Sequence, residues 1–178
     1  MRAGLLSLLV VVSGCGTLSG AFSRVPVPQE ITPASNQKLE MVLVAKGVQI
    51  YRCDRKPEAH AGFEWSLQAP DAILRDVAGK YLGKHYAGPT WEAEDGSKVV
   101  GTINARRDAS ERGAIPWLRL ATRSTGSAGI FAGVTTIVRI GTSGGIAPTA
   151  GCNEADLGTI MRVPYSADYF FYKKSDAR

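Results

Sequence analysis

The segment from Gly83 to Ser97 contains the densest group of side chains that could carry out chemistry. It reads G-K-H-Y-A-G-P-T-W-E-A-E-D-G-S. A histidine titrates near neutral pH and can serve as acid or base, and two nearby carboxylates can share a proton or orient a sugar. Tyrosine and tryptophan rings can stack on a sugar ring. The candidate ligand-binding residues are His85, Tyr86, Trp91, Glu92, Asp95 and Ser97.

The same segment also has a structural interpretation. Asp95-Gly96 is typical of a hairpin turn, and Trp91 is large enough to fill a core position. A single histidine without a partner at a regular spacing more often serves structure than catalysis. We therefore name no catalytic residue. A small hydrolase that uses His85 with Glu92 or Asp95 is the alternative to a binding role.

A second pattern, G-T-S-G-G at residues 141–145, fits the G-x-S-x-G nucleophile elbow of hydrolases. An elbow needs a helix after the serine, but I-A-P-T-A-G at residues 146–151 cannot begin one. Both histidines, His60 and His85, also precede Ser143, whereas the hydrolase order is serine, acid, histidine. We interpret the glycines instead as loop positions with positive φ.

The N-terminus has the features of a bacterial export signal. A positive charge at Arg2 precedes an apolar run from Leu5 to Val12, which is too short to span a membrane. V-S-G-C at residues 12–15 then resembles the lipobox of bacterial lipoproteins. The resemblance implies cleavage before Cys15, lipid on that cysteine and, since no aspartate follows it, attachment at the outer membrane. The alternative is an ordinary secretory signal cut near Gly20-Ala21.

Two cysteines, Cys53 and Cys152, remain if Cys15 carries lipid. An even pair in an oxidising compartment predicts a disulfide bond between them. The alternative is a metal site in which His60 and His85 join the two cysteines, but no spacing matches a known zinc pattern. We therefore expect a disulfide, no metal and no cofactor.

The charge distribution is uneven along the chain. There are 21 basic and 16 acidic residues, and the excess of arginines lies in the second half. Attraction to an anionic surface is one interpretation, but we favour a solvent-exposed strand face. Export, and the lack of a recognisable nucleic-acid-binding module, argue against nucleic acid as a partner. These arginines include Arg106, Arg107, Arg112, Arg119, Arg123 and Arg139.

Short alternating segments predict the elements that must position these residues. Strands are expected at residues 48–53, 63–67, 98–104, 117–122, 134–140 and 169–173. Residues 70–76 fit either one helical turn or a strand, and glycine-rich turns separate the segments. No long amphipathic stretch predicts a helix bundle. We expect an all-β fold, a single antiparallel β-sandwich or barrel-like domain with short helical turns.

Three regions are expected along the chain. Residues 1–14 form the signal peptide, and residues 15–37 form a lipidated, flexible tether with three prolines. Residues 38–178 form one β-rich domain. The mature chain would have about 160 residues, which suits one ordinary domain.

Several of these segments together resemble one family. They are G-V-Q-I-Y-R-C from Gly47, the region 83–101, G-T-S-G-G-I-A-P with a following cysteine, and V-P-Y-S-A-D-Y-F-F-Y from Val163. Across residues 47–172 the chain resembles the uncharacterised domain-of-unknown-function 3455 family, whose members are similar secreted or envelope proteins. The resemblance implies one exported domain and suggests no reaction.

These patterns lead to one main functional hypothesis. We expect a lipid-anchored envelope protein that contacts the membrane through its anchor. It would bind a glycan or a partner protein through residues 83–97 without catalysis. A purely structural envelope protein is a further alternative.

Overall fold

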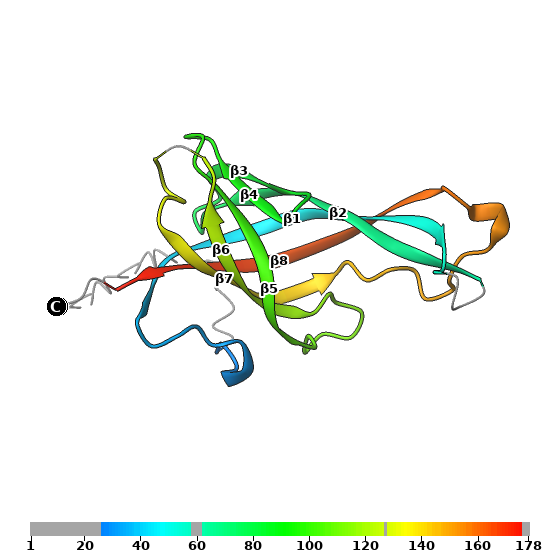
Figure 1. The fold of residues 1–178 in the computed structure, drawn as a ribbon, viewed down its shortest axis with the longest axis horizontal. Helices are drawn as coiled ribbons and strands as arrows, with labels where there is room; N and C mark the ends of the chain where they lie inside the picture. Colours follow the sequence, from blue (N-terminus) through cyan, green and yellow to red (C-terminus); the bar gives the residue numbers. More distant parts are fainter. Residues whose placement is uncertain (1–25, 58–61, 127, 176–178) are drawn as a thin grey trace, which may run out of the picture.

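Eight antiparallel strands close into a barrel in the part of the chain that the computed structural model describes, residues 26–57, 62–126 and 128–175 (Figure 1). Each strand pairs with the next along the chain, and the last pairs with the first. The strands are β1 (Gln37–Arg55), β2 (Phe63–Arg75), β3 (Tyr81–Tyr86), β4 (Thr90–Ala93), β5 (Lys98–Arg107), β6 (Trp117–Ser124), β7 (Val134–Gly144) and β8 (Ile160–Lys174). The predicted all-β antiparallel fold is confirmed.

Two short 3-10 turns accompany the strands, η1 (Gln29–Ile31) and η2 (Glu154–Asp156). Among the described residues, no helix has the length and hydropathy that a membrane span requires. The predicted signal peptide, the lipidation site Cys15 and the residue His60 lie outside the described residues.

Strand alternation explains what fills the barrel. Along β8, Tyr165, Ala167, Tyr169 and Phe171 are buried in the interior cluster. Successive side chains of a strand point to opposite faces, so the residues between them face outward. The other strands contribute interior residues in the same way, and these include Leu43, Leu74, Trp91, Val99, Leu120 and Ile137.

The segment before β1 covers part of the outer face. Ile31 of η1 is fully buried, and it packs with Val27 against Trp117, Val138 and Ile140. This differs from the expected free tether up to residue 37, because the apolar side chains between the prolines find an apolar patch on the barrel wall. Arg107 holds the same segment through an ion pair with Glu30, at 2.7 Å.

Three of the strands are longer than the barrel and extend beyond one end as an arm (Figure 1). In the arm, β1 continues between β2 and β8, with Cys53 opposite Trp65 and Arg52 opposite Ile160. The predicted disulfide is confirmed there: Cys53 of β1 is bonded to Cys152, with their Cα atoms 6.1 Å apart. The bond closes a loop of 99 residues, for which the chain-entropy model gives about 4–5 kcal/mol of stabilisation.

Candidate functional site

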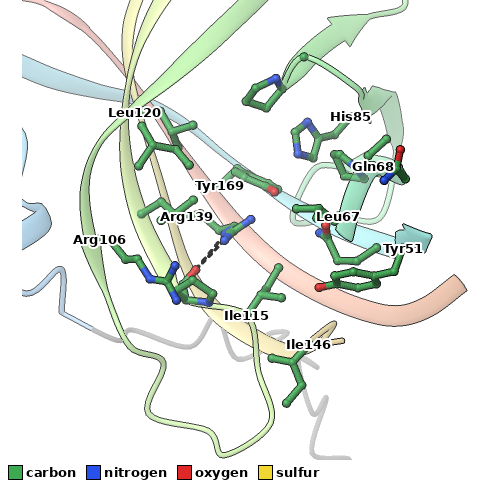
Figure 2. Close-up of a pocket in the computed structure, with 18 of the residues that line it drawn as sticks. Tyr51, Leu67, Gln68, His85, Arg106, Ile115, Leu120, Arg139, Ile146 and Tyr169 are labelled. Atoms are coloured by element: carbon green, nitrogen blue, oxygen red, sulfur yellow. Dashed lines mark hydrogen bonds between the residues drawn. The ribbon is translucent and has the colours of Figure 1, made fainter. Parts of the chain in front are cut away.

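A pocket of about 600 Å³ lies inside the barrel, at the end from which the arm extends (Figure 2). Its walls are mainly apolar. They include Leu118 and Leu120 of β6 and Ile115, and Leu67, Ile103 and Ile146 lie at the mouth. Such a volume and such a lining are typical of sites for small molecules.

The other end of the barrel interior is packed with apolar side chains. Phe131 and Phe171 stack there with ring centroids 4.9 Å apart, and both are fully buried. Toward the pocket, the interior positions hold Gln49 and Arg139 instead. An eight-stranded barrel has an interior just wide enough to be filled by side chains or to hold one small ligand.

Arg139 of β7 is the charged group in the interior of this pocket. It follows the interior residue Ile137 at the two-residue spacing of a strand and is half-buried. Its Nε and Nη2 atoms donate hydrogen bonds to the carbonyl oxygen of Pro116, at 3.1 and 2.8 Å. No carboxylate of a described residue forms an ion pair with it. A second arginine, Arg106, also lines the pocket, and no aspartate or glutamate is among the lining residues.

Three buried polar atoms at the pocket have no hydrogen-bond partner among the described residues. They are Gln49 Nε2, Trp91 Nε1 and Tyr169 Oη. The exposed fractions of these residues are 2%, 1% and 1%. Buried polar atoms are almost always paired, because leaving one unpaired costs about 1–3 kcal/mol. Three of the six such atoms among the described residues belong to residues that line this pocket, where a ligand or bound water would satisfy them.

His85 lies on the same wall as Trp91. Its Nδ1 is 2.8 Å from the carbonyl oxygen of Thr90. Because a carbonyl only accepts, Nδ1 carries the proton and Nε2 is left as an acceptor. The ring stacks on Trp91 with centroids 4.3 Å apart and meets Tyr169 edge-on. Burial lowers the pKa of His85 to about 3, so the ring is neutral at physiological pH.

The six candidate residues predicted from the sequence are not brought together. His85 of β3 and Trp91 of β4 face each other inside the barrel, whereas their neighbours Tyr86 and Glu92 point outward. On the outer face, the Tyr86 hydroxyl donates to Glu92 at 2.5 Å, and Lys98 lies 3.3 Å from the same carboxylate. The tyrosine hydrogen bond and the lysines lower the pKa of Glu92.

Asp95 and Ser97 lock the turn between β4 and β5. Asp95 Oδ1 accepts hydrogen bonds from the backbone N–H and the hydroxyl of Ser97, at 2.9 and 2.5 Å. Its Oδ2 accepts from the backbone N–H of Ile130 at 2.8 Å, and Ser97 Oγ accepts from that of Phe131. Both carboxylate oxygens are therefore used to fix loops. Neither Asp95 nor the outward-facing Glu92 is positioned beside His85, so the geometry does not favour the hydrolase alternative.

The G-x-S-x-G pattern ends a strand. Gly141, Gly144 and Gly145 have φ values of +57°, +66° and +86°. Glycine adopts such positive values without the steric strain that a side chain would cause. They lie in and just after β7, however, and not in a free loop. Ser143 is on the exterior and donates to Glu111 at 2.7 Å. Among the described residues, no histidine lies beside Ser143.

The pocket depends on residues that the sequence analysis did not select for a site, above all Gln49, Arg139 and Tyr169. One signal was present: in the run V-T-T-I-V-R-I, Arg139 occupies the same alternating face as Ile137. An arginine on an interior face is unusual. As for metals, no group of three or more suitable side chains occurs in the described part of the chain.

The comparisons with known proteins give a family and no activity. No curated protein and no solved structure matches the chain. One family model, described as a protein of unknown function (DUF3455), matches residues 33–173. The match includes all eight strands except the last residue of β8, together with the pocket and both cysteines of the disulfide. The chain therefore belongs to the DUF3455 family of proteins of unknown function.

Proposed function

We propose that this protein is a non-catalytic binding module that holds a small, mainly apolar molecule in the open end of its barrel. The observation that carries the proposal is the group of unpartnered polar atoms on Gln49, Trp91 and Tyr169 around a 600 Å³ pocket. A fold tolerates such atoms at a cost in stability. Binding sites are the usual place where such a cost persists, because a ligand then satisfies the groups.

The shape of the pocket decides between kinds of ligand. A folded protein or a long glycan would bind on an outer face, but the outer-face candidates Tyr86 and Glu92 already bind each other and Lys98. The apolar interior walls suit a small molecule that enters from the mouth. Binding is favoured over hydrolysis because no acid is positioned beside the neutral His85.

We place this binding in the cell envelope, with the protein anchored by lipid on Cys15 and facing the periplasm or the cell surface at the outer membrane. The lipobox-like sequence supports this proposal, and so does the disulfide, which needs an oxidising compartment. The measurement is the intact mass of the full chain expressed in a Gram-negative host. A mass that begins at Cys15 and includes acyl chains is expected, and a mass without them would contradict the anchor.

The binding proposal is tested with a neutral fluorescent probe, N-phenylnaphthylamine, whose emission rises in apolar surroundings. The full chain would carry Cys15→Ala so that attached lipid does not compete. We expect saturable binding at one site. Ala147→Trp, which fills the mouth, should weaken it at least about tenfold.

The control is the same substitution three residues away. Ala150 is exposed in the same loop and does not line the pocket, so Ala150→Trp should leave probe binding unchanged. If both variants bind the probe as the parent does, the probe lies on an outer surface and the proposal fails. If the parent binds no probe, it fails as well.

A further inference from the structure

We infer that the ligand is an organic anion, an apolar body with one acid group, and that Arg139 binds the acid group. The inference rests on the proposed binding function and names its ligand class. The acid group would be a carboxylate or another singly charged oxyanion such as a sulfonate. The body would lie against the leucine wall of β6 and the stacked rings of His85 and Trp91.

The first argument is the missing counter-charge. A guanidinium that is half-buried in an apolar pocket loses part of its hydration, and proteins usually compensate this with a carboxylate. Arg139 has a backbone carbonyl as its partner, which supplies no negative charge. The lining adds Arg106 and no acid. The pocket is therefore positive, and an anion is the partner that it lacks.

The second argument is the orientation of the guanidinium. Two of its nitrogen atoms are held by the Pro116 carbonyl, which fixes the plane of the group (Figure 2). The Nη1 atom does not take part in these two bonds, and the guanidinium lies beside the hydroxyl of Tyr169. An arginine held in this way binds an acid group with little further loss of conformational freedom.

The third argument is the position of Arg139 among the pocket rings. Burial raises the pKa of Tyr169 and Tyr51 and lowers that of His85, and the nearby positive charge of Arg139 acts to lower all three. Figure 2 shows these side chains directed toward a common space from different walls. The unpartnered hydroxyl of Tyr169 is beside Arg139, so it can donate to the same acid group.

The side chains at the pocket mouth are suited to contact the apolar part of the ligand. Leu67 and Ile103 are each 55% exposed and Ile146 is 38% exposed, and all three line the pocket. An apolar chain or ring that fills the pocket would cover them. Arg106 lies with them and is exposed, where its charge would attract an anion toward the entrance.

The test compares probes that differ only in the acid group. Anilinonaphthalene sulfonate has the ring system of N-phenylnaphthylamine with a sulfonate added. We expect the sulfonate to bind at least about tenfold more tightly than the neutral probe, since hydrogen bonds to charged groups contribute more. As competitors, decanoate should displace the probe better than decanol, and naphthoate better than naphthalene methanol. The two acids distinguish a linear from an aromatic body.

The variant that removes the charge is Arg139→Gln. The ratio of its affinities for each acid and the matching neutral compound should fall toward one. Arg139→Lys keeps a charge without the planar fork and should show an intermediate preference. The matched control is Arg123→Gln on the exposed face of β6, which removes the same net charge and should change nothing.

The outcomes separate this inference from the proposed function. If the neutral probes bind and the acids gain nothing, the binding function stands and the anion inference is overturned. The same holds if Arg123→Gln removes the preference as much as Arg139→Gln, because the effect would then be net charge. If Arg139→Gln does not fold, the comparison of acids and alcohols on the parent chain still decides.

Discussion

The two ends of the barrel interior are built from different kinds of side chain. At one end, Phe131, Phe171 and Val99 pack as fully buried residues without a hydrogen-bonding group. At the other end, Gln49 and Tyr169 are equally buried, and each has a polar atom without a partner. The first arrangement maximises apolar burial, and the second gives up part of it for polar groups. Under the proposed binding function, stability and binding are located in different parts of one barrel.

The largest expected effect compares two leucines of the same strand. Leu74 of β2 is fully buried toward the closed end, whereas Leu67 is 55% exposed at the pocket mouth. Leu74→Ala should lower the free energy of unfolding by about 3 kcal/mol, because it leaves a cavity in a packed core. Leu67→Ala should lower it by less than about 1 kcal/mol. Denaturant unfolding followed by circular dichroism measures both.

Probe binding should show the reverse order. With both variants folded, Leu67→Ala should weaken binding of N-phenylnaphthylamine and Leu74→Ala should leave it nearly unchanged. Equal losses of stability in the two variants would contradict the division between the ends. So would a loss of binding in Leu74→Ala alone.

A smaller effect is expected from His85 as the pH falls. Its pKa is about 3 in the folded protein, because burial disfavours the charged ring, and about 6.5 in the unfolded chain. The unfolded chain then binds more protons between these values, so stability is complete above pH 6.5 and is lost as the pH falls. Between pH 7.5 and 5 the loss should be about 2 kcal/mol.

Two variants isolate this contribution. His85→Phe keeps an aromatic ring beside Trp91 and should abolish the loss of stability between pH 7.5 and 5. The chain has one other histidine, His60, and His60→Asn should leave the loss unchanged. A pH dependence that persists in His85→Phe would assign it to other groups.

Local sequence patterns were enough to predict part of the fold. Alternation located segments that lie within β2, β5, β6, β7 and β8, and it located the half of β1 that ends near Cys53. The first half of β1 and the short β3 and β4 were not identified as strands. β4 has four residues, too few to show a period. Closure of the barrel depends on pairing between β1 and β8, which no local pattern records.

The site could be predicted only in part for the same physical reason. Residue type drew attention to residues 83–97, and two of the six candidates, His85 and Trp91, line the pocket. Their neighbours Tyr86 and Glu92 face outward, since adjacent residues of a strand lie on opposite faces. Arg139 lies opposite Tyr169 through the pairing of β7 with β8. A shift of one residue in that register would have moved it outside.

The smallest expected effect compares two tyrosines that both line the pocket. The Tyr51 hydroxyl donates to the carbonyl oxygen of Gly145 at 2.7 Å, whereas the Tyr169 hydroxyl has no partner among the described residues. Tyr51→Phe should therefore lower the free energy of unfolding by about 1 kcal/mol. Tyr169→Phe should leave it unchanged or raise it by up to about 1 kcal/mol, since it removes an unsatisfied buried group.

Tyr169→Phe should also weaken binding of anilinonaphthalene sulfonate while stability is kept, and this combination would identify the hydroxyl as a ligand-binding group. Denaturant unfolding and probe titration of the same two variants measure both quantities. A loss of stability in Tyr169→Phe equal to that in Tyr51→Phe would show that its hydroxyl is already satisfied within the fold. The open end of the barrel would then not differ from the closed end in the way that the unpartnered atoms indicate.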